Sequence, residues 1–196
     1  MSLLISSTAF SQSHLYLKGN ALFAPVGIIN IGAEQQISRK TTIQVDGFLS
    51  PWKSFLGKNL TIGMLGMDFR YYFKEAFKHF YIGANVSAAT YNMQKWNYWN
   101  DEYFQLSPES PVYIKSNLYQ KGYSIMFGAT VGYQFQINQK WNLDLYVGGG
   151  NSQDFYKGYD KITGNRYDTE DPNKKWNRSG EIIPYRGGLM ISYQIK

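Results

Sequence analysis

The clearest pattern along the chain is an alternation of apolar side chains with small or polar ones between residues 123 and 137. The apolar positions are Tyr123, Ile125, Phe127, Ala129, Val131, Tyr133, Phe135 and Ile137. Successive side chains of a strand point to opposite faces, so this stretch predicts one long β-strand. An ordinary strand runs about five or six residues. A strand this long with one wholly apolar face is typical of a transmembrane β-barrel.

Seven other segments show the same alternation. They are residues 16–24, 28–37, 41–49, 60–73, 79–91, 141–150 and 182–196. Their connections alternate between short turns, such as 38–40 and 138–140, and longer loops at 50–59, 92–121 and 151–181. Outer-membrane barrels have short periplasmic turns and long extracellular loops. The sequence therefore predicts an all-β fold, an eight-stranded antiparallel up-and-down transmembrane β-barrel in a bacterial outer membrane, with both termini in the periplasm.

Aromatic side chains near the predicted short turns support this orientation. They are Tyr71, Tyr72, Phe73, Phe77, Phe80, Tyr81, Tyr133, Phe135, Trp141 and Tyr193. Amphipathic rings gather at membrane interfaces, so we expect them to form an aromatic girdle at the periplasmic side. The alternative is that these rings form the core of a soluble barrel.

The polar face of each predicted strand carries the residues that would point inward. They are Lys18, Asn20, Asn30, Glu34, Gln44, Asp46, Asp68, Arg70, Asn85, Ser87, Gln134, Asp144 and Arg186. Barrels of about eight strands are just filled by side chains, and an unpaired buried charge costs several kcal/mol. We therefore expect a polar, plugged lumen held by a charge network of seven residues: Lys18, Glu34, Asp46, Asp68, Arg70, Asp144 and Arg186.

Composition narrows the class of protein further. The chain has no cysteine, which excludes disulfides and thiol chemistry. Its 17 tyrosines, 12 phenylalanines and 19 glycines favour an all-β protein. The net charge of +6 is scattered over loops and turns, which argues against a nucleic-acid partner. No run of about 18 apolar residues predicts a transmembrane helix.

The first residues resemble the end of a secretion signal. The apolar Leu3-Leu4-Ile5 is followed by Ala9-Phe10-Ser11, which has small residues where a signal peptidase needs them. We expect residues 1–11 to be a residual signal peptide cleaved before Gln12, which leaves residues 12–196 as the barrel domain. The alternative is a short apolar start to the first strand.

Several short motifs resemble those of a known family. They are Lys18-Gly19-Asn20, Gly32-Ala33-Glu34, Ser50-Pro51-Trp52, Asp68-Phe69-Arg70-Tyr71-Tyr72-Phe73 and Gly132-Tyr133-Gln134-Phe135. From about Leu17 to the C-terminus the chain resembles a family of uncharacterised outer-membrane β-barrels common in Bacteroidota, small OmpA-like eight-stranded barrels with a domain of unknown function. The resemblance implies a fold and a location, and it implies no activity.

Candidate catalytic and metal-binding residues are few. Acyl transfer needs a nucleophile with a base in hydrogen-bond reach, and the chain has only His14 and His79. We expect His79 beside a short turn and Ser87 further along the same strand, so they form no catalytic pair. Two isolated histidines without cysteine exclude a zinc cluster, and residues 168–173 lack the spacing and glycine of a calcium loop. The sequence predicts no catalytic site, no metal and no cofactor.

The predicted outer loops contain most of the remaining functional signal. The aromatic residues expected to make contacts there are Trp96, Tyr98, Trp99, Tyr103, Phe104 and Trp176. Exposed Trp and Tyr anchor interfaces and stack on sugars, although the same rings can pack a loop on itself. We expect a non-catalytic structural or accessory subunit, with outer-membrane lipid and lipopolysaccharide around it and other outer-membrane proteins as partners. The alternatives are a lipid-A-modifying or hydrolytic enzyme, and a surface binder of glycans or proteins.

Overall fold

The computed structural model describes residues 14–55 and 57–196, and it shows ten antiparallel strands, so the all-β prediction is confirmed. The strands are β1 Leu15–Asn20, β2 Ile29–Gln36, β3 Thr41–Phe55, β4 Lys58–Tyr72, β5 His79–Met93, β6 Tyr103–Phe104, β7 Tyr113–Ile114, β8 Leu118–Gln136, β9 Trp141–Asp160 and β10 Asn177–Gln194. Three short 3₁₀ turns lie in the connections: η1 Ala24–Val26, η2 Trp96–Tyr98 and η3 Lys115–Asn117. Among the described residues, no helix has the length and apolar character needed to cross a membrane. The expected signal-peptide remnant, residues 1–11, lies outside the described residues.

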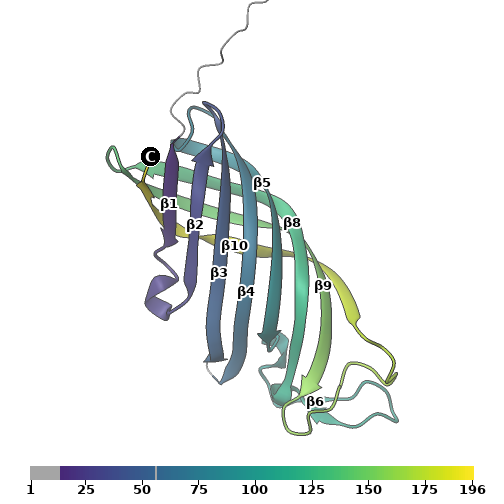
Figure 1. Cartoon of the computed structure of the whole chain (residues 1–196). Helices are drawn as coiled ribbons and strands as arrows, with labels where there is room; N and C mark the ends of the chain where they lie inside the picture. Colours follow the sequence, from purple (N-terminus) through teal and green to yellow (C-terminus); the bar gives the residue numbers. More distant parts are fainter. Residues whose placement is uncertain (1–13, 56) are drawn as a thin grey trace, which may run out of the picture.

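Eight of the strands close into a barrel in the order β1-β10-β9-β8-β5-β4-β3-β2, and every neighbouring pair is antiparallel (Figure 1). The two remaining strands, β6 and β7, form a small separate sheet within the connection between β5 and β8. Consecutive strands along the chain are therefore neighbours in the barrel, and the first strand pairs with the last.

Several strands are longer than the alternation predicts. β3 continues to Phe55, which pairs with Lys58 of β4, so the loop expected at 50–59 is wrong. β9 extends to Asp160, and β10 begins at Asn177, five residues before the predicted start. In these extensions both faces carry polar residues, which hides the alternation, while pairing with neighbouring strands continues. As a result, β8 and β9 reach further than β1 and β2 at the end opposite the C-terminus (Figure 1).

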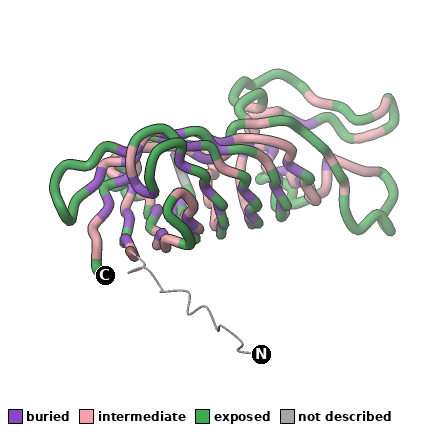
Figure 2. The backbone as a smooth tube through the Cα atoms, turned by 90° about the horizontal axis from the view of Figure 1, so that it is seen from above, coloured by how far each residue is buried: buried purple, intermediate pink, exposed green. Residues whose placement is uncertain are grey.

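The barrel is polar inside and apolar outside. All thirteen residues expected to point inward are buried, and buried and exposed positions alternate along the strands (Figure 2). The outward side chains are large, apolar and exposed: Leu17, Ile31, Val45, Leu65, Met67, Phe69, Ile82, Val86, Ile125, Phe127, Val131, Leu145, Val147 and Ile191. Soluble proteins bury such residues and rarely expose an apolar surface of this extent.

One inward residue departs from the simple alternation. The odd positions of β10 point outward from Gly187 onward, which predicts an outward Tyr185. The pairing of β10 with β9 shifts between Pro184 and Arg186, and a bulge of this kind redirects a side chain. Tyr185 accordingly points into the barrel and donates its hydroxyl proton to Asn85.

Candidate functional site

The centre of the lumen holds a fully buried ionic cluster. Lys18 Nζ lies 2.6 Å from Glu34 Oε2 and 2.5 Å from Asp144 Oδ2. Arg70 Nη1 lies 3.2 Å and 2.8 Å from the same two oxygens, and Arg70 Nε lies 2.9 Å from Asp68 Oδ2. Two carboxylates are thus each shared by two cations. The residues come from β1, β2, β4 and β9, so the cluster ties together opposite parts of the barrel wall.

Tyrosine and threonine hydroxyls complete this cluster. Tyr81 donates to Asp144 Oδ1 at 2.9 Å, and Thr42 donates to Glu34 Oε1 at 2.6 Å. The Arg70 guanidinium also lies over the Tyr81 ring, 4.6 Å from its centroid. Gly132 makes room for this ring, because a Cβ there would come within 2.5 Å of the Tyr81 hydroxyl. Glu34 and Asp144 therefore each have charged and neutral donors, as buried charges require, whereas Asp68 has Arg70 as its donor and its buried Oδ1 has no hydrogen-bond partner among the described residues.

A second ion pair lies apart from the cluster. Arg186 Nη2 contacts Asp46 Oδ1, which also accepts a hydrogen bond of 3.0 Å from Gln44 Nε2. The structure thus groups five of the seven expected network residues in the cluster and places the other two in this pair. Arg186 also lines a cavity of about 360 Å³ on the side of the lumen away from the cluster.

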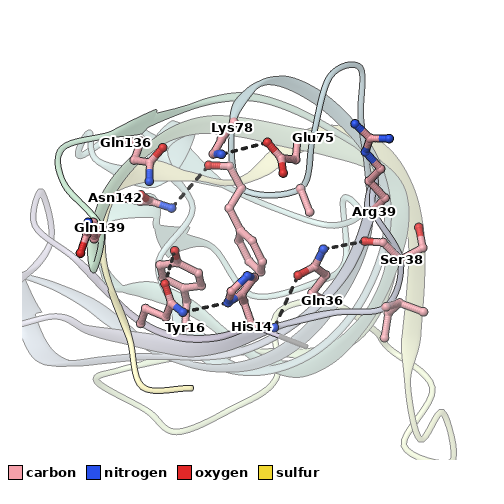
Figure 3. A pocket seen from close by; sticks show the side chains of 14 residues that line it. His14, Tyr16, Gln36, Ser38, Arg39, Glu75, Lys78, Gln136, Gln139 and Asn142 are labelled. Atoms are coloured by element: carbon pink, nitrogen blue, oxygen red, sulfur yellow. Dashed lines mark hydrogen bonds and ion pairs between the residues drawn. The ribbon is translucent and has the colours of Figure 1, made fainter. Parts of the chain in front are cut away.

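The turn between β4 and β5 closes the mouth of the barrel beside the termini. Ala76 and Phe77 are buried there, and the Phe77 ring lies 4.4 Å from the Tyr16 ring. Phe77 has a φ of 64°, in the left-handed region that non-glycine residues rarely adopt. Asn142 Nδ2 donates to the Phe77 carbonyl at 3.4 Å, as Figure 3 shows. The turn between β4 and β5 therefore folds inward and covers this mouth of the barrel. We call this turn, with the buried Ala76 and Phe77, the Phe77 stopper.

The prediction of the aromatic girdle is wrong for three of its residues. Phe77, Tyr72 and Tyr81 are buried inside the barrel and cannot contact a membrane interface. Of the other girdle residues, Tyr71, Phe73, Phe80, Phe135 and Trp141 are exposed on the outward face, and Tyr133 and Tyr193 are partly exposed. The alternation predicts an inward Tyr72, because Tyr72 lies two residues after the inward Arg70 on β4. Phe77 lies in a turn, where the alternation gives no signal.

The same mouth contains a polar cavity of about 580 Å³ (Figure 3). Its wall includes His14, whose Nδ1 lies 2.8 Å from Gln194 Nε2, and the exposed pair Glu75 and Lys78. The hydrogen bond from Lys78 Nζ holds the pKa of Glu75 below its usual value. Among the described residues that line this cavity, we find polar side chains and no nucleophile within hydrogen-bond distance of a base.

The two residues considered for hydrolytic chemistry lie apart. His79 is exposed at the start of β5, and its Nδ1 lies 2.9 Å from the Tyr133 hydroxyl. Ser87 is buried in the lumen further along β5. They form no nucleophile–base pair. In the part of the chain that the structure describes, no three His, Cys, Asp or Glu residues gather in a way that could hold a metal.

The outer connections divide the expected contact residues into two groups. Tyr98 and Phe104 pack against a buried cluster of Tyr113, Leu118 and Tyr167. Burial also raises the pKa of the Tyr167 hydroxyl. The exposed group consists of Trp96, Trp99 and Tyr103, together with Trp176, whose ring lies against Tyr123 on the barrel wall.

Gln94 organises the longest connection, although no sequence pattern singles it out. Its Nε2 lies within hydrogen-bond distance of the carbonyl oxygens of Tyr98, Lys115 and Ser116, at 3.0, 3.3 and 2.8 Å. Gln94 itself is buried. Because this one amide contacts three backbone carbonyls, it holds η2 and η3 together where β5 ends and β8 begins.

We expect Tyr72→Phe to destabilise the barrel by about 1–3 kcal/mol, the cost of leaving buried polar atoms unpaired. The Tyr72 hydroxyl lies 2.7 Å from Glu34 Oε1 and 2.6 Å from Gln134 Oε1. Tyr71→Phe is the matched control, because Tyr71 is adjacent on β4 and points outward. Urea unfolding followed by tryptophan fluorescence measures both. Equal stability of the two variants would show that this hydroxyl does not support the cluster.

The fold and the lumen define an all-β protein whose closed antiparallel sheet surrounds a buried ionic cluster. The chain belongs to the family described as "Protein of unknown function (DUF3575)", whose model matches residues 1–195. No curated protein and no solved structure matches the chain.

Proposed function

We propose that this protein is an integral barrel of a bacterial outer membrane. The observation that carries the proposal is the inversion of the usual pattern, with charges inside and apolar side chains outside. Tyr123 and Phe135 are twelve residues apart on β8, which at about 3.4 Å per residue and a tilt of about 45° spans roughly 29 Å. The apolar band of known outer-membrane barrels is about 25 Å tall. The apolar band of the outward face is therefore tall enough to cross the apolar core of a bilayer.

The proposed orientation places both termini in the periplasm. Residues 37–40, 73–78 and 137–140 connect strands at the same end as the termini, and all three connections are short. The opposite end carries the long connections 94–117 and 161–176. Short periplasmic turns and long extracellular loops are the rule in such barrels. The exposed Trp96, Trp99 and Tyr103 then face the cell exterior.

A non-catalytic accessory role fits this geometry best. The ionic cluster and the Phe77 stopper occupy the lumen, so the barrel is poorly suited to conduct solutes as a pore. His79 and Ser87 are separated, which supports the absence of hydrolytic chemistry. Trp96 and Tyr103 are 82% and 76% exposed on the outer loop, and exposed aromatic residues are frequent anchors of interfaces. The proposed function is docking of another outer-membrane protein through this loop.

The test is isolation of the tagged protein from native outer membranes in mild detergent, with stoichiometry measured by native mass spectrometry. We expect a companion at fixed ratio, lost in the double variant Trp96→Ala/Tyr103→Ala because interface anchors typically contribute about 2 kcal/mol or more each. Ile162→Ala is the control, since Ile162 is 77% exposed on the neighbouring loop. A wild-type protein recovered only as a bare monomer would contradict the docking role.

A further inference from the structure

The outward face of the barrel carries a cluster of cations on β8, β9 and β10, near the end where the barrel carries its long connections. Lys121 on β8 and Lys157 on β9 are directly opposite each other in the strand register. Arg178 on β10 pairs with Phe155, the outward residue of β9 before Lys157. Three cations from three adjacent strands thus share one surface, which we call the basic rim patch.

Aromatic rings lie under each of these cations. Lys121 Nζ lies 5.4 Å and 5.9 Å from the ring centroids of Tyr119 and Tyr159, which stack on each other. Lys157 Nζ lies 4.9 Å from the Trp176 ring, and the Arg178 guanidinium carbon lies 5.5 Å from the Phe155 ring. Rings at such distances attract the cations and support their long side chains along the wall.

The basic rim patch lacks an anion. Like charges directly opposite each other on a sheet destabilise it, yet none of its three cations forms an ion pair with a residue that the structure describes. The nearby acidic side chains have other partners: Asp154 accepts hydrogen bonds from Ser124 and Ser152, and Glu181 lies 3.8 Å from Lys95. An anion from outside the chain would remove this repulsion.

The height of the patch indicates which anion. Tyr123, Phe155 and Trp176 form a cluster of rings at the end of the apolar face that is farthest from the termini. The stacked rings of Tyr123 and Phe155 have centroids 4.9 Å apart. Lys121 precedes Tyr123 by two residues on β8 and Lys157 follows Phe155 by two on β9, so both lysines lie roughly 5 Å beyond these rings at the usual strand rise and tilt. Aromatic rings mark the edge of the hydrocarbon region. In the proposed membrane the lysines therefore lie at the level of lipid headgroups.

We propose that the basic rim patch binds the phosphate of a phosphorylated lipid in the outer leaflet. This inference rests on the proposed membrane location. The lysines and Arg178 would contact the phosphate oxygens, while the acyl chains would follow the apolar wall below, where Ile125, Phe127 and Ile182 are exposed. Phosphate and acyl chain are then recognised by adjacent surfaces of the same three strands.

The experiment titrates the protein in detergent micelles with diphosphoryl lipid A and with the dephosphorylated form of the same lipid, counting bound lipid by native mass spectrometry. Each cation near an anionic surface contributes on the order of fivefold in affinity. We expect at least about tenfold weaker binding of the dephosphorylated lipid, and a similar loss in Lys121→Gln/Lys157→Gln for the phosphorylated one. The control is Lys53→Gln/Lys58→Gln, which removes two lysines from the β3–β4 hairpin at the same end of the barrel.

Equal affinities of the two double variants, or of the two lipids, would overturn the lipid site. Competition by inorganic phosphate at micromolar concentration would also overturn it, because the site would then take the free ion. Insertion is measured in parallel by protection of the strands from protease in vesicles. A protein that fails to insert contradicts the proposed function itself, whereas an inserted protein without lipid preference contradicts only this inference.

Discussion

Replacing Arg70 with methionine is expected to destabilise the barrel by about 3–5 kcal/mol, the usual result of removing one partner from a buried ionic group. The Arg70 guanidinium contacts Glu34, Asp68 and Asp144. Without it, Glu34 and Asp144 would share Lys18 alone, and Asp68 would lose its ion pair. Methionine fills much of the same volume, so the loss reflects charge rather than a cavity. Urea unfolding of the protein in vesicles, followed by tryptophan fluorescence, measures the free energy.

Two further variants make this result specific to the cluster. Arg39→Met removes an arginine from the exposed turn between β2 and β3, where the loss of stability should stay within about 0.5 kcal/mol. Adding Glu34→Gln and Asp144→Asn to Arg70→Met should recover part of the lost stability, because fewer unpaired charges remain. If Arg70→Met unfolds at the same urea concentration as Arg39→Met, the buried network contributes nothing measurable to the fold.

Placing a charge in the middle of the outward face should have the second largest effect. Val147 lies on β9 midway between Trp141 and Phe155 and is 53% exposed. An arginine at the midplane of a membrane barrel costs about 2–4 kcal/mol. The same change on the exposed surface of a soluble protein is usually within about 0.5 kcal/mol. The free energy of unfolding of Val147→Arg in vesicles therefore distinguishes lipid from water around the barrel.

Gln153→Arg is the matched control for this depth dependence. Gln153 also points outward on β9 and is exposed, but it lies close to the basic rim patch at the outer end. Near the membrane interface the cost of an arginine falls to about 0–1 kcal/mol. A small and equal cost for both variants would indicate that the outward face contacts water over its whole height.

The sequence predicts the strands well where the outward face is apolar and poorly where it is not. Along residues 123–137 every outward position is apolar, so the alternation is visible. In residues 151–160, outward Asn151, Gln153 and Lys157 are as polar as their inward neighbours. Backbone pairing with β8 and β10 continues the strand there, and pairing of this kind leaves no signal in the side-chain pattern.

The charged lumen illustrates the same limit at the level of the site. Parity alone assigns Lys18, Glu34 and Arg70 to the inward face, because a strand has only two faces. Which cation meets which carboxylate depends on the register around the closed sheet. That register separates Arg186 and Asp46 from the others. The Phe77 stopper is unpredictable for another reason, since it depends on a turn with positive φ at a residue that is not glycine.

The central claim, a sealed barrel with its outward face in lipid, is tested most directly by a single-cysteine scan of residues 141–155 on β9. The chain has no cysteine, so every label reports one position. Spin labels on protein in vesicles are exposed to oxygen, which enters the bilayer, and to a water-soluble nickel complex. We predict a period of two, with outward positions accessible to oxygen, most strongly near Val147, and inward positions shielded from both reagents. Access of the nickel complex to labels at 143, 145 and 147 would contradict the membrane barrel.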